Sequence, residues 1–273
     1  MPELPEVEVV RRGLEPLLVG RVIVDAACLG PRLRLAPPLA EIERLAVGGK
    51  GRELRRRGKY LLLELDNQTR LVFHLGMTGR LGVFPKNEQI KTHDHWLFAL
   101  DDQTELRFND TRRFGSLQLL PPGQDEATIF GALGPEPLQG GFSVAYLLSR
   151  AQGRRQPVKS FLMDNRVVVG IGNIYASESL FAARVLSTKP AGTLSLAACR
   201  RIVTSSRQVL SQAIAAGGTT ISDFANASGE AGYFQLQLMV YDRAGQPCRV
   251  CGATIRKIVL GGRSTFFCPR CQR

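Results

Sequence analysis

Apolar residues near the start of the chain recur at the spacing of a helix. Four of them lie at steps of three and four residues: Val7, Val10, Leu14 and Leu17. Such steps place all four on one helical face. Pro5 suits the first turn, because an N–H group there would have no partner. The pattern predicts an N-terminal helix whose apolar face is anchored to a core.

After this helix the chain changes to the alternation of apolar and polar residues that is typical of strands. Short strands are predicted at 21–27, 52–65, 70–74, 96–100, 105–108 and 116–120. The polar residues 101–104 are few enough to form a hairpin turn. Many short strands behind one leading helix favour a β-sandwich or a barrel over a parallel sheet.

Helical signals dominate the second half of the chain. Ser143 can cap a helix over 144–151, and Ser195 can cap a longer helix that ends at Gly217 and Gly218. The apolar face of the longer helix is predicted to consist of Leu196, Ile202, Val203, Leu210, Ala213 and Ile214. The runs 121–123 and 134–137 are rich in proline and glycine, which indicates a linker between the strand-rich and the helical parts.

Four of the six cysteines form two close pairs near the end of the chain. Sixteen residues separate the pair Cys248 and Cys251 from the pair Cys268 and Cys271. Two such knuckles arrange four thiolates in a tetrahedron, the closed geometry of structural zinc. Zinc would supply folding free energy that so small a unit cannot obtain from a core. The other two cysteines, Cys28 and Cys199, are predicted to be buried and unreactive.

A hairpin is predicted between the two cysteine pairs. Strands at 255–260 and 263–267 flank Gly261 and Gly262, which suit a two-residue turn. Arg263 therefore lies near the tip. Together these patterns predict an α+β chain in four parts: 1–122, a linker at 123–137, a helical domain at 138–235 and a zinc hairpin at 236–273.

The charge balance of the chain favours a polyanionic partner. Lys and Arg number 36 against 24 acidic residues, for a formal net charge of +12. Binding to such a partner weakens steeply as salt rises. Charge alone does not exclude a merely soluble basic protein. No apolar run approaches the length of a membrane span, and the acidic start is unlike a signal peptide. We therefore expect a cytoplasmic location.

The first residues combine a reactive amine with acids. Removal of Met1 leaves Pro2 as a free secondary amine, with Glu3 and Glu6 close by in the sequence. A secondary amine that condenses with a sugar aldehyde gives a cationic iminium, which is a strong electron sink. The alternative is an ordinary helix start with proline and acids.

Three segments together resemble the bacterial formamidopyrimidine-DNA glycosylases, which excise oxidised purines. They are PELPEVE at the start, MDNRVVVGIGNIYASESLF at 163–181, and the terminal cysteine hairpin. The resemblance covers essentially the whole chain. It implies a β-sandwich, a helix-two-turn-helix domain with a lesion-capping loop at 219–233, one structural zinc ion, and a monomer that acts on double-stranded DNA with oxidised bases or abasic sites.

The resemblance also implies a role for each site residue. Pro2 would be the nucleophile that attacks C1′, and Glu3 the general acid that helps open the sugar. Lys59 would assist β-elimination, and Arg263 would assist δ-elimination and grip a phosphate. The implied DNA contacts are His93, Arg112, Arg154, Lys159 and Asn173. The implied wedge, which fills the stack behind an extruded base, consists of Met77 and of Arg112 with Phe114.

Several of these residues have a simpler interpretation. Strand alternation puts Lys59 on a face with Leu61 and Leu63, although a snorkelling lysine at a strand end fits as well. Arg263 is equally typical of a solvated turn. Asn173 suits a left-handed turn, or a helix start whose N–H groups face a phosphate.

Three more interpretations stay open at the sequence level. His93 and His95 on one strand face could pair on a metal, but a phosphate contact or a buried histidine fits better because no third ligand is evident. Met77 and Phe114 are the kind of residue most often found in cores. Thr111 stands where the family often has proline, which predicts altered loop stiffness without loss of activity.

Two rival functions remain. A glycosylase of the related branch that acts on oxidised pyrimidines shares this plan, but its usual opening differs from PELPEVE. A non-catalytic protein that binds damaged DNA would keep the scaffold without the chemistry. Pro2, Glu3, Lys59 and Arg263 argue against that second rival.

Overall fold

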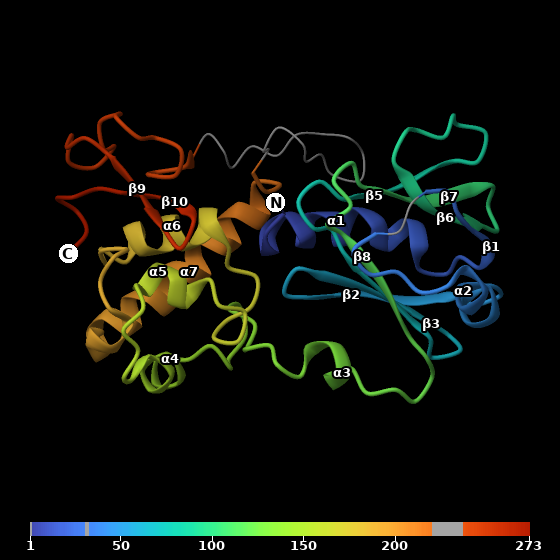
Figure 1. Cartoon of the computed structure of the whole chain (residues 1–273), viewed down its shortest axis with the longest axis horizontal. Helices are drawn as coiled ribbons and strands as arrows, with labels where there is room; N and C mark the ends of the chain where they lie inside the picture. The colour runs from blue at the N-terminus through green and yellow to red at the C-terminus, as the bar shows by residue number, and fades with distance from the viewer. Residues whose placement is uncertain (1, 31–32, 220–236) are drawn as a thin grey trace. The chain divides into compact units, whose positions relative to one another are not determined.

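The computed structural model describes residues 2–30, 33–219 and 237–273 (Figure 1). They form two compact units: the first runs to Gly131 and includes Gly217, and the second comprises Ala132–Ala216 and the C-terminal residues. The predicted lesion-capping loop lies outside the described residues, except for Thr219. No helix in the described ranges is long and apolar enough to cross a bilayer.

The first unit contains two antiparallel four-stranded sheets, as the alternation predicted. One sheet has the order β1 (Ile23–Cys28), β6 (Asp94–Leu100), β7 (Thr104–Asn109), β5 (Arg80–Pro85). The other has the order β2 (Gly51–Arg57), β3 (Tyr60–Leu65), β4 (Arg70–His74), β8 (Ser116–Leu120). One apolar cluster draws residues from both sheets and from helix α1 (Leu4–Leu18), which confirms the β-sandwich with a leading helix.

Helix α1 buries a slightly different stripe from the predicted one. Leu4, Val7, Val10, Leu14 and Leu18 are buried, whereas the side chain of Leu17 is 42% exposed. The reason is helical geometry: at about 100° per residue, Leu18 lies closer than Leu17 to the centre of the face formed by the other buried residues. Each buried side chain contributes about 1.5–3 kcal/mol, so the stripe fixes the helix and its N-terminus firmly.

Other strand and helix predictions need correction. Residues 52–65 form two strands, β2 and β3, because Gly58 has a positive φ of 57° and turns the chain. Strand β5 and helix α2 (Leu39–Ala46) were not predicted. Helix α2 is short and directly follows Pro37 and Pro38, which are more typical of a loop, so its few apolar residues did not indicate a helix. Strand β6 is buried along its whole length and therefore shows no clear alternation.

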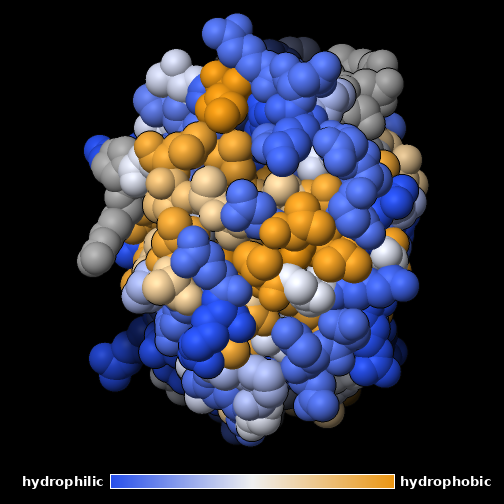
Figure 2. Space-filling model, turned by 90° about the vertical axis from the view of Figure 1, so that its right-hand side faces the viewer, coloured by the Kyte–Doolittle hydropathy of each residue, from blue (hydrophilic) through white to orange (hydrophobic). Residues whose placement is uncertain are grey.

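The surface of the first unit also carries apolar side chains. Figure 2 shows a group of hydrophobic residues bordered by hydrophilic ones on one face. Val24, Leu29 and Leu35 are among the large apolar residues that the first unit exposes. Exposed apolar atoms are a normal part of folded surfaces, and we assign this face no partner.

The second unit begins with helices whose caps match the sequence. Ser143 Oγ accepts a hydrogen bond from Tyr146 N (3.1 Å) at the start of α4 (Val144–Ala151). Ser195 Oγ does the same for Ala198 N (3.2 Å) at the start of α7 (Leu196–Ala215). Leu196 was predicted to be buried but is 52% exposed, because first-turn residues lie at the rim of the packed face. The remaining helices of this unit are α5 (Val158–Leu162), α6 (Asn173–Ala182) and the 3₁₀ helix η1 (Ala191–Thr193), whereas the short helix α3 (Ala127–Phe130) belongs to the first unit.

A small hairpin completes the second unit. Strands β9 (Arg256–Leu260) and β10 (Arg263–Phe267) pair through the predicted turn, in which Gly261 and Gly262 have positive φ angles of 53° and 74°. Such angles at both turn positions match a type I′ hairpin. The apolar cluster beside the hairpin contains only six buried residues. So small a core supports the prediction that a metal stabilises this part.

Candidate DNA-processing site and metal centre

The N-terminus is held by a buried carboxylate. Pro2 is buried and precedes α1, and Glu3 (2% exposed) is the N-cap residue. Glu6 Oε2 accepts a hydrogen bond from Glu3 N at 2.8 Å. This closes the first turn and fixes the backbone next to Pro2. The sequence placed Glu6 close to the Pro2 amine, but its function in accepting several hydrogen bonds was missed.

The other oxygen of Glu6 binds the segment that follows α7. Glu6 Oε1 accepts hydrogen bonds from both the backbone N and the Oγ1 of Thr219, each at 2.9 Å. Gly218 makes this approach possible: it has φ of +80°, and a Cβ there would come within 3.2 Å of Glu6 Oε1. One carboxylate therefore positions both Pro2 and the first described residue of the predicted capping loop.

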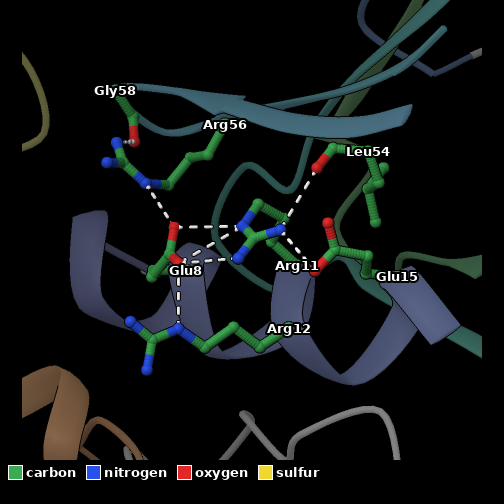
Figure 3. Close-up of polar contacts among 7 residues, drawn as sticks. All are labelled: Glu8, Arg11, Arg12, Glu15, Leu54, Arg56 and Gly58. Carbon is green, nitrogen blue, oxygen red and sulfur yellow. Dashed lines mark hydrogen bonds and ion pairs between the residues drawn. The ribbon is translucent and has the colours of Figure 1, made fainter.

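A second carboxylate of α1 organises a cluster of guanidinium groups (Figure 3). Glu8 Oε2 accepts a hydrogen bond from Arg56 Nε at 3.0 Å, while Arg11 and Arg12 bind Oε1. Burial alone raises the pKa of Glu8, but the hydrogen bonds from these arginines outweigh it and leave the pKa below its ordinary value. Glu8 therefore stays ionised at neutral pH.

Arg56 extends this cluster to the turn that carries Lys59. Arg56 Nη1 donates to Gly58 O at 3.0 Å, so one guanidinium joins Glu8 on α1 to the turn between β2 and β3. Lys59 lies in this turn, half-buried, and not in a strand as its alternation with Leu61 suggested. The run of three arginines before Gly58 was the available sequence signal for this link.

His74, at the end of β4, was also missed. Burial lowers its pKa to about 4, helped by the positive charges of Arg34 and Lys59. The imidazole is therefore neutral at pH 7. Its Nδ1 accepts a hydrogen bond from Gly76 N at 3.1 Å. His74 pairs across the sheet with Tyr60, the residue after Lys59, and holds the start of the loop that carries Met77.

The predicted wedge residues are exposed, which rules out the core interpretation. Met77 is 38% exposed and Phe114 is 45% exposed. The Arg112 guanidinium lies over the Phe114 ring, 4.9 Å from its centroid. Arg112 itself is exposed, so all three side chains are accessible to a ligand.

Buried Asp110 ties the two wedge loops together. Its Oδ1 accepts from Thr78 Oγ1 at 2.5 Å, and its Oδ2 accepts from Gly115 N at 2.7 Å. A Cβ at Gly76, where φ is +62°, would lie 2.5 Å from the backbone of Phe114. Glycine is therefore required for the close approach of the two loops.

The two histidines near β6 occupy different environments. His93 precedes the strand with φ of 75° and is exposed, so it does not share a strand face with His95 as predicted. His95 is buried, and its Nε2 donates to Asp110 O at 2.9 Å. Among the described residues, only the four cysteines group like metal ligands, which leaves the histidine metal pair without support.

In the second unit a buried lysine joins three elements. Lys159 is 1% exposed, and its Nζ donates to Asn173 Oδ1 (2.6 Å), Ser264 O (2.8 Å) and Thr265 Oγ1 (2.8 Å). These bonds link α5, the start of α6 and strand β10. A direct DNA contact of Lys159 stays a prediction; its described contacts position Asn173 and the strand that begins with Arg263.

The remaining predicted contacts of this unit lie at its surface. Asn173 is the first residue of α6, after the N-cap Gly172, and does not adopt the left-handed conformation. Arg154 and Arg263 are exposed, and Arg263 directly follows the glycine turn of the hairpin.

The four predicted ligand cysteines come together. Their Sγ atoms lie within 4.8 Å of one another, with Cys248–Cys271 at 3.9 Å and Cys251–Cys268 at 3.4 Å. Tetrahedral zinc–thiolate bonds place sulfurs about 3.8 Å apart, so the cluster fits zinc and not a disulfide. Backbone N–H groups of Val250 and Cys271 point at the sulfurs of Cys248 and Cys268, as expected around metal-bound thiolates.

Of the two cysteines outside the cluster, one differs from the prediction. Cys199 is buried, and burial raises the pKa of its thiol. Cys28 is exposed, because it ends strand β1.

Comparison with known proteins identifies the family. Family models match residues 1–117 (formamidopyrimidine-DNA glycosylase N-terminal domain), 133–225 (the H2TH domain of the same enzyme) and 245–273 (a zinc finger found in FPG and IleRS). The formamidopyrimidine-DNA glycosylases of Methylococcus capsulatus and Acidithiobacillus ferrooxidans are each 48% identical over 273 residues, which covers both chains completely.

Solved structures agree with the sequence comparison. A Lactococcus lactis FPG mutant in complex with DNA containing Fapy-dG matches with a TM-score of 0.93 at 31% identity, covering 100% of each chain. The MutM (FPG) protein from Thermus thermophilus matches with a TM-score of 0.88 at 38% identity, covering 99% of this chain and 98% of that one. The chain described here therefore belongs to the formamidopyrimidine-DNA glycosylase family.

Proposed function

We propose that this protein is a bifunctional DNA glycosylase and abasic-site lyase of base excision repair, which excises 8-oxoguanine and formamidopyrimidines and then cleaves the strand. Family membership supports the activity. The observation that carries the proposed chemistry is the position of Pro2, buried beside the N-cap residue Glu3 on a turn closed by Glu6. Removal of Met1 would turn Pro2 into a preorganised secondary amine.

In the proposed reaction the Pro2 nitrogen attacks C1′ of the damaged nucleoside, and the bond from C1′ to the base breaks. The base leaves with a proton, which balances the proton that the Pro2 nitrogen loses. Glu3 protonates the ring oxygen as the sugar opens, which leaves an iminium between Pro2 and C1′. The iminium acidifies the C2′ proton. Its removal, assisted by Lys59, expels the 3′ phosphate; a second elimination, assisted by Arg263, expels the 5′ phosphate. Water then releases Pro2.

We further propose how the DNA is held. Met77 and Phe114 fill the space behind the extruded nucleotide, and Arg112 pairs with the orphaned base. Four other residues are proposed to contact the DNA: His93, Arg154, Lys159 and Asn173. Zinc on Cys248, Cys251, Cys268 and Cys271 would be structural: it would fix the hairpin and leave no coordination position for water.

The proposed functional division follows the sequence: a catalytic domain at 1–122, a linker at 123–137, a DNA-binding domain at 138–235 and the zinc hairpin at 236–273. We propose that the protein acts as a monomer in the cytoplasm, on chromosomal duplex DNA.

The test is covalent trapping with borohydride on duplexes that carry 8-oxoguanine or an abasic site. Borohydride reduces the iminium, so the wild-type protein becomes attached to DNA. One extra residue in front of Pro2 should abolish trapping and leave duplex binding largely intact. Trapping that survives this block would refute Pro2 as the nucleophile.

Oxidised pyrimidines are a second candidate substrate. A similar Lactococcus lactis FPG structure, 32% identical, holds DNA containing an oxidised pyrimidine. Parallel excision assays on 8-oxoguanine and thymine glycol would decide between the two. Faster excision of thymine glycol would overturn the assignment to oxidised purines.

A further inference from the structure

The second unit contains a positively charged pocket beside the zinc cysteines, and apart from Cys271 none of its lining residues has a role in the proposed repair function. It has a volume of about 860 Å³, within the range of roughly 300–1,000 Å³ that is common for small-molecule sites. Its walls come from the end of α6, from α7 and from both cysteine knuckles. Its cationic lining residues are Arg184, Lys189, Arg201, Arg270 and Arg273.

The cations of this pocket are not neutralised by acidic side chains. Its lining contains no Asp or Glu, and within the described ranges none of its five cations makes an ion pair. Arg201 Nε donates to the backbone oxygen of Ala183 at 2.9 Å, which orients its guanidinium without removing its charge. A pocket whose Arg and Lys side chains face no Asp or Glu attracts negatively charged ligands.

The zinc centre does not account for all of this charge. Four thiolates on Zn²⁺ carry a formal charge of −2, and Cys271 lines the pocket. The five cationic side chains exceed the number needed to balance this charge. Phe181 and Val250 add an apolar wall, which would suit a group that is partly nonpolar.

The pocket is also built on a firmly held backbone. Gln272 Nε2 donates to Val185 O at 2.9 Å, and Leu186 N donates to Arg273 O at 3.2 Å, so the C-terminal residues are joined to the segment after α6. Arg184 in that segment has φ of 56°, an unusual conformation for a large side chain. The cations are thus presented from positions fixed by hydrogen bonds.

We propose that this pocket binds a phosphate-bearing anion of about the size of a nucleotide. Arginine and lysine side chains that converge without acids are the usual partners of phosphate oxygens. The phosphates could belong to a free nucleoside polyphosphate or to the backbone of a second DNA segment. The proposal is independent of the glycosylase chemistry.

The test is calorimetric titration of the zinc-loaded full chain with ATP and with inorganic tripolyphosphate. The pocket variant is Arg184→Asn combined with Lys189→Gln; Asn tolerates a positive φ, and neither position is in a cysteine knuckle. We expect binding of at least one of the two probes to be at least about tenfold weaker in this variant, which corresponds to about 1.4 kcal/mol, because charge-assisted hydrogen bonds to phosphate are lost. Unchanged zinc content would show that the variant is folded.

The matched control is Arg44→Gln combined with Lys86→Gln, which removes the same charge from exposed positions of the first unit. It should bind ATP and tripolyphosphate like the wild type. A second arm adds a short undamaged duplex to protein already saturated with lesion-bearing duplex: binding that the pocket variant loses would identify DNA backbone, and binding of ATP alone would identify a nucleotide. The proposal would be overturned if the wild type and the pocket variant bound both phosphate probes and the second duplex with equal affinity. It would also be overturned if the pocket variant and the control variant lost affinity equally.

Discussion

Both units use a buried, formally charged side chain to join segments of the chain, and two such side chains, Glu6 and Lys159, are of opposite sign. Glu6 in the first unit accepts hydrogen bonds from Glu3 N and from both donors of Thr219. Lys159 in the second unit donates to Asn173, Ser264 O and Thr265. A buried charged group is costly unless hydrogen-bonded. In both units these hydrogen bonds join segments that are far apart in the sequence, next to proposed site residues. Pro2 and Glu3 lie beside Glu6, and Asn173 and Arg263 lie beside the groups that Lys159 binds.

The largest expected effect comes from removal of the buried ammonium. Lys159→Met keeps the length of the side chain but leaves three acceptors without their donor, so we expect a loss of about 3–5 kcal/mol in the free energy of unfolding. Chemical denaturation measures it, with Lys86→Met at an exposed position as the control. A loss below about 1 kcal/mol would show that Lys159 does not hold the hairpin.

His74 should make the pH dependence of the two units differ. Its pKa falls from 6.5 to about 4 on folding, so the unfolded chain binds the proton more readily. The associated stability is complete above pH 6.5 and is lost as the pH falls toward 4, by up to about 3 kcal/mol. All three histidines lie in the first unit. Hydrogen exchange at pH 6.5 and pH 5 should therefore show the first unit weakening more, and His74→Gln should reduce the difference. If the two units of His74→Gln still differed in pH dependence as they do in the wild type, His74 would be excluded as the cause.

Glu6→Gln is expected to cost about 2 kcal/mol, less than the loss of Lys159, because an amide keeps one acceptor oxygen but turns an NH₂ group toward a donor. Glu43→Gln on exposed α2 is the matched control. Borohydride trapping should also fall, even when it is compared at equal amounts of folded protein, because the Pro2 backbone would be held less firmly. Normal trapping by a folded Glu6→Gln protein would show that the Glu6 carboxylate is not needed to position Pro2 for the reaction.

The smallest expected effect is on the Lys59 turn. Arg56→Met removes the link between Glu8 and Gly58, and we expect strand cleavage to slow about tenfold, or about 1.4 kcal/mol, while base excision changes less. Arg52→Met, on an exposed position of the same strand, is the control. Equal slowing of excision and cleavage would indicate a general structural effect of Arg56.

Local patterns predicted the elements with strong local signals. The Ser143 and Ser195 caps, the Gly261–Gly262 turn and the four-cysteine cluster are all as expected, because each depends on residues close in the sequence. Strand β6 was predicted in part, at 96–100, although burial on both faces leaves it without a clear alternation. Lys59 was placed in a strand, whereas the turn at Gly58 puts it between β2 and β3.

The sequence by itself determined the sandwich class, the metal ligands and, through the resemblance, the proposed catalytic residues. Only the tertiary structure decided that Glu6 reaches Thr219, that Arg56 connects α1 to the Lys59 turn, and that Lys159 is buried against β10. Each of these contacts joins residues that are about fifty to more than two hundred positions apart. No local periodicity encodes such pairs, since they form only when the packed core brings the segments together.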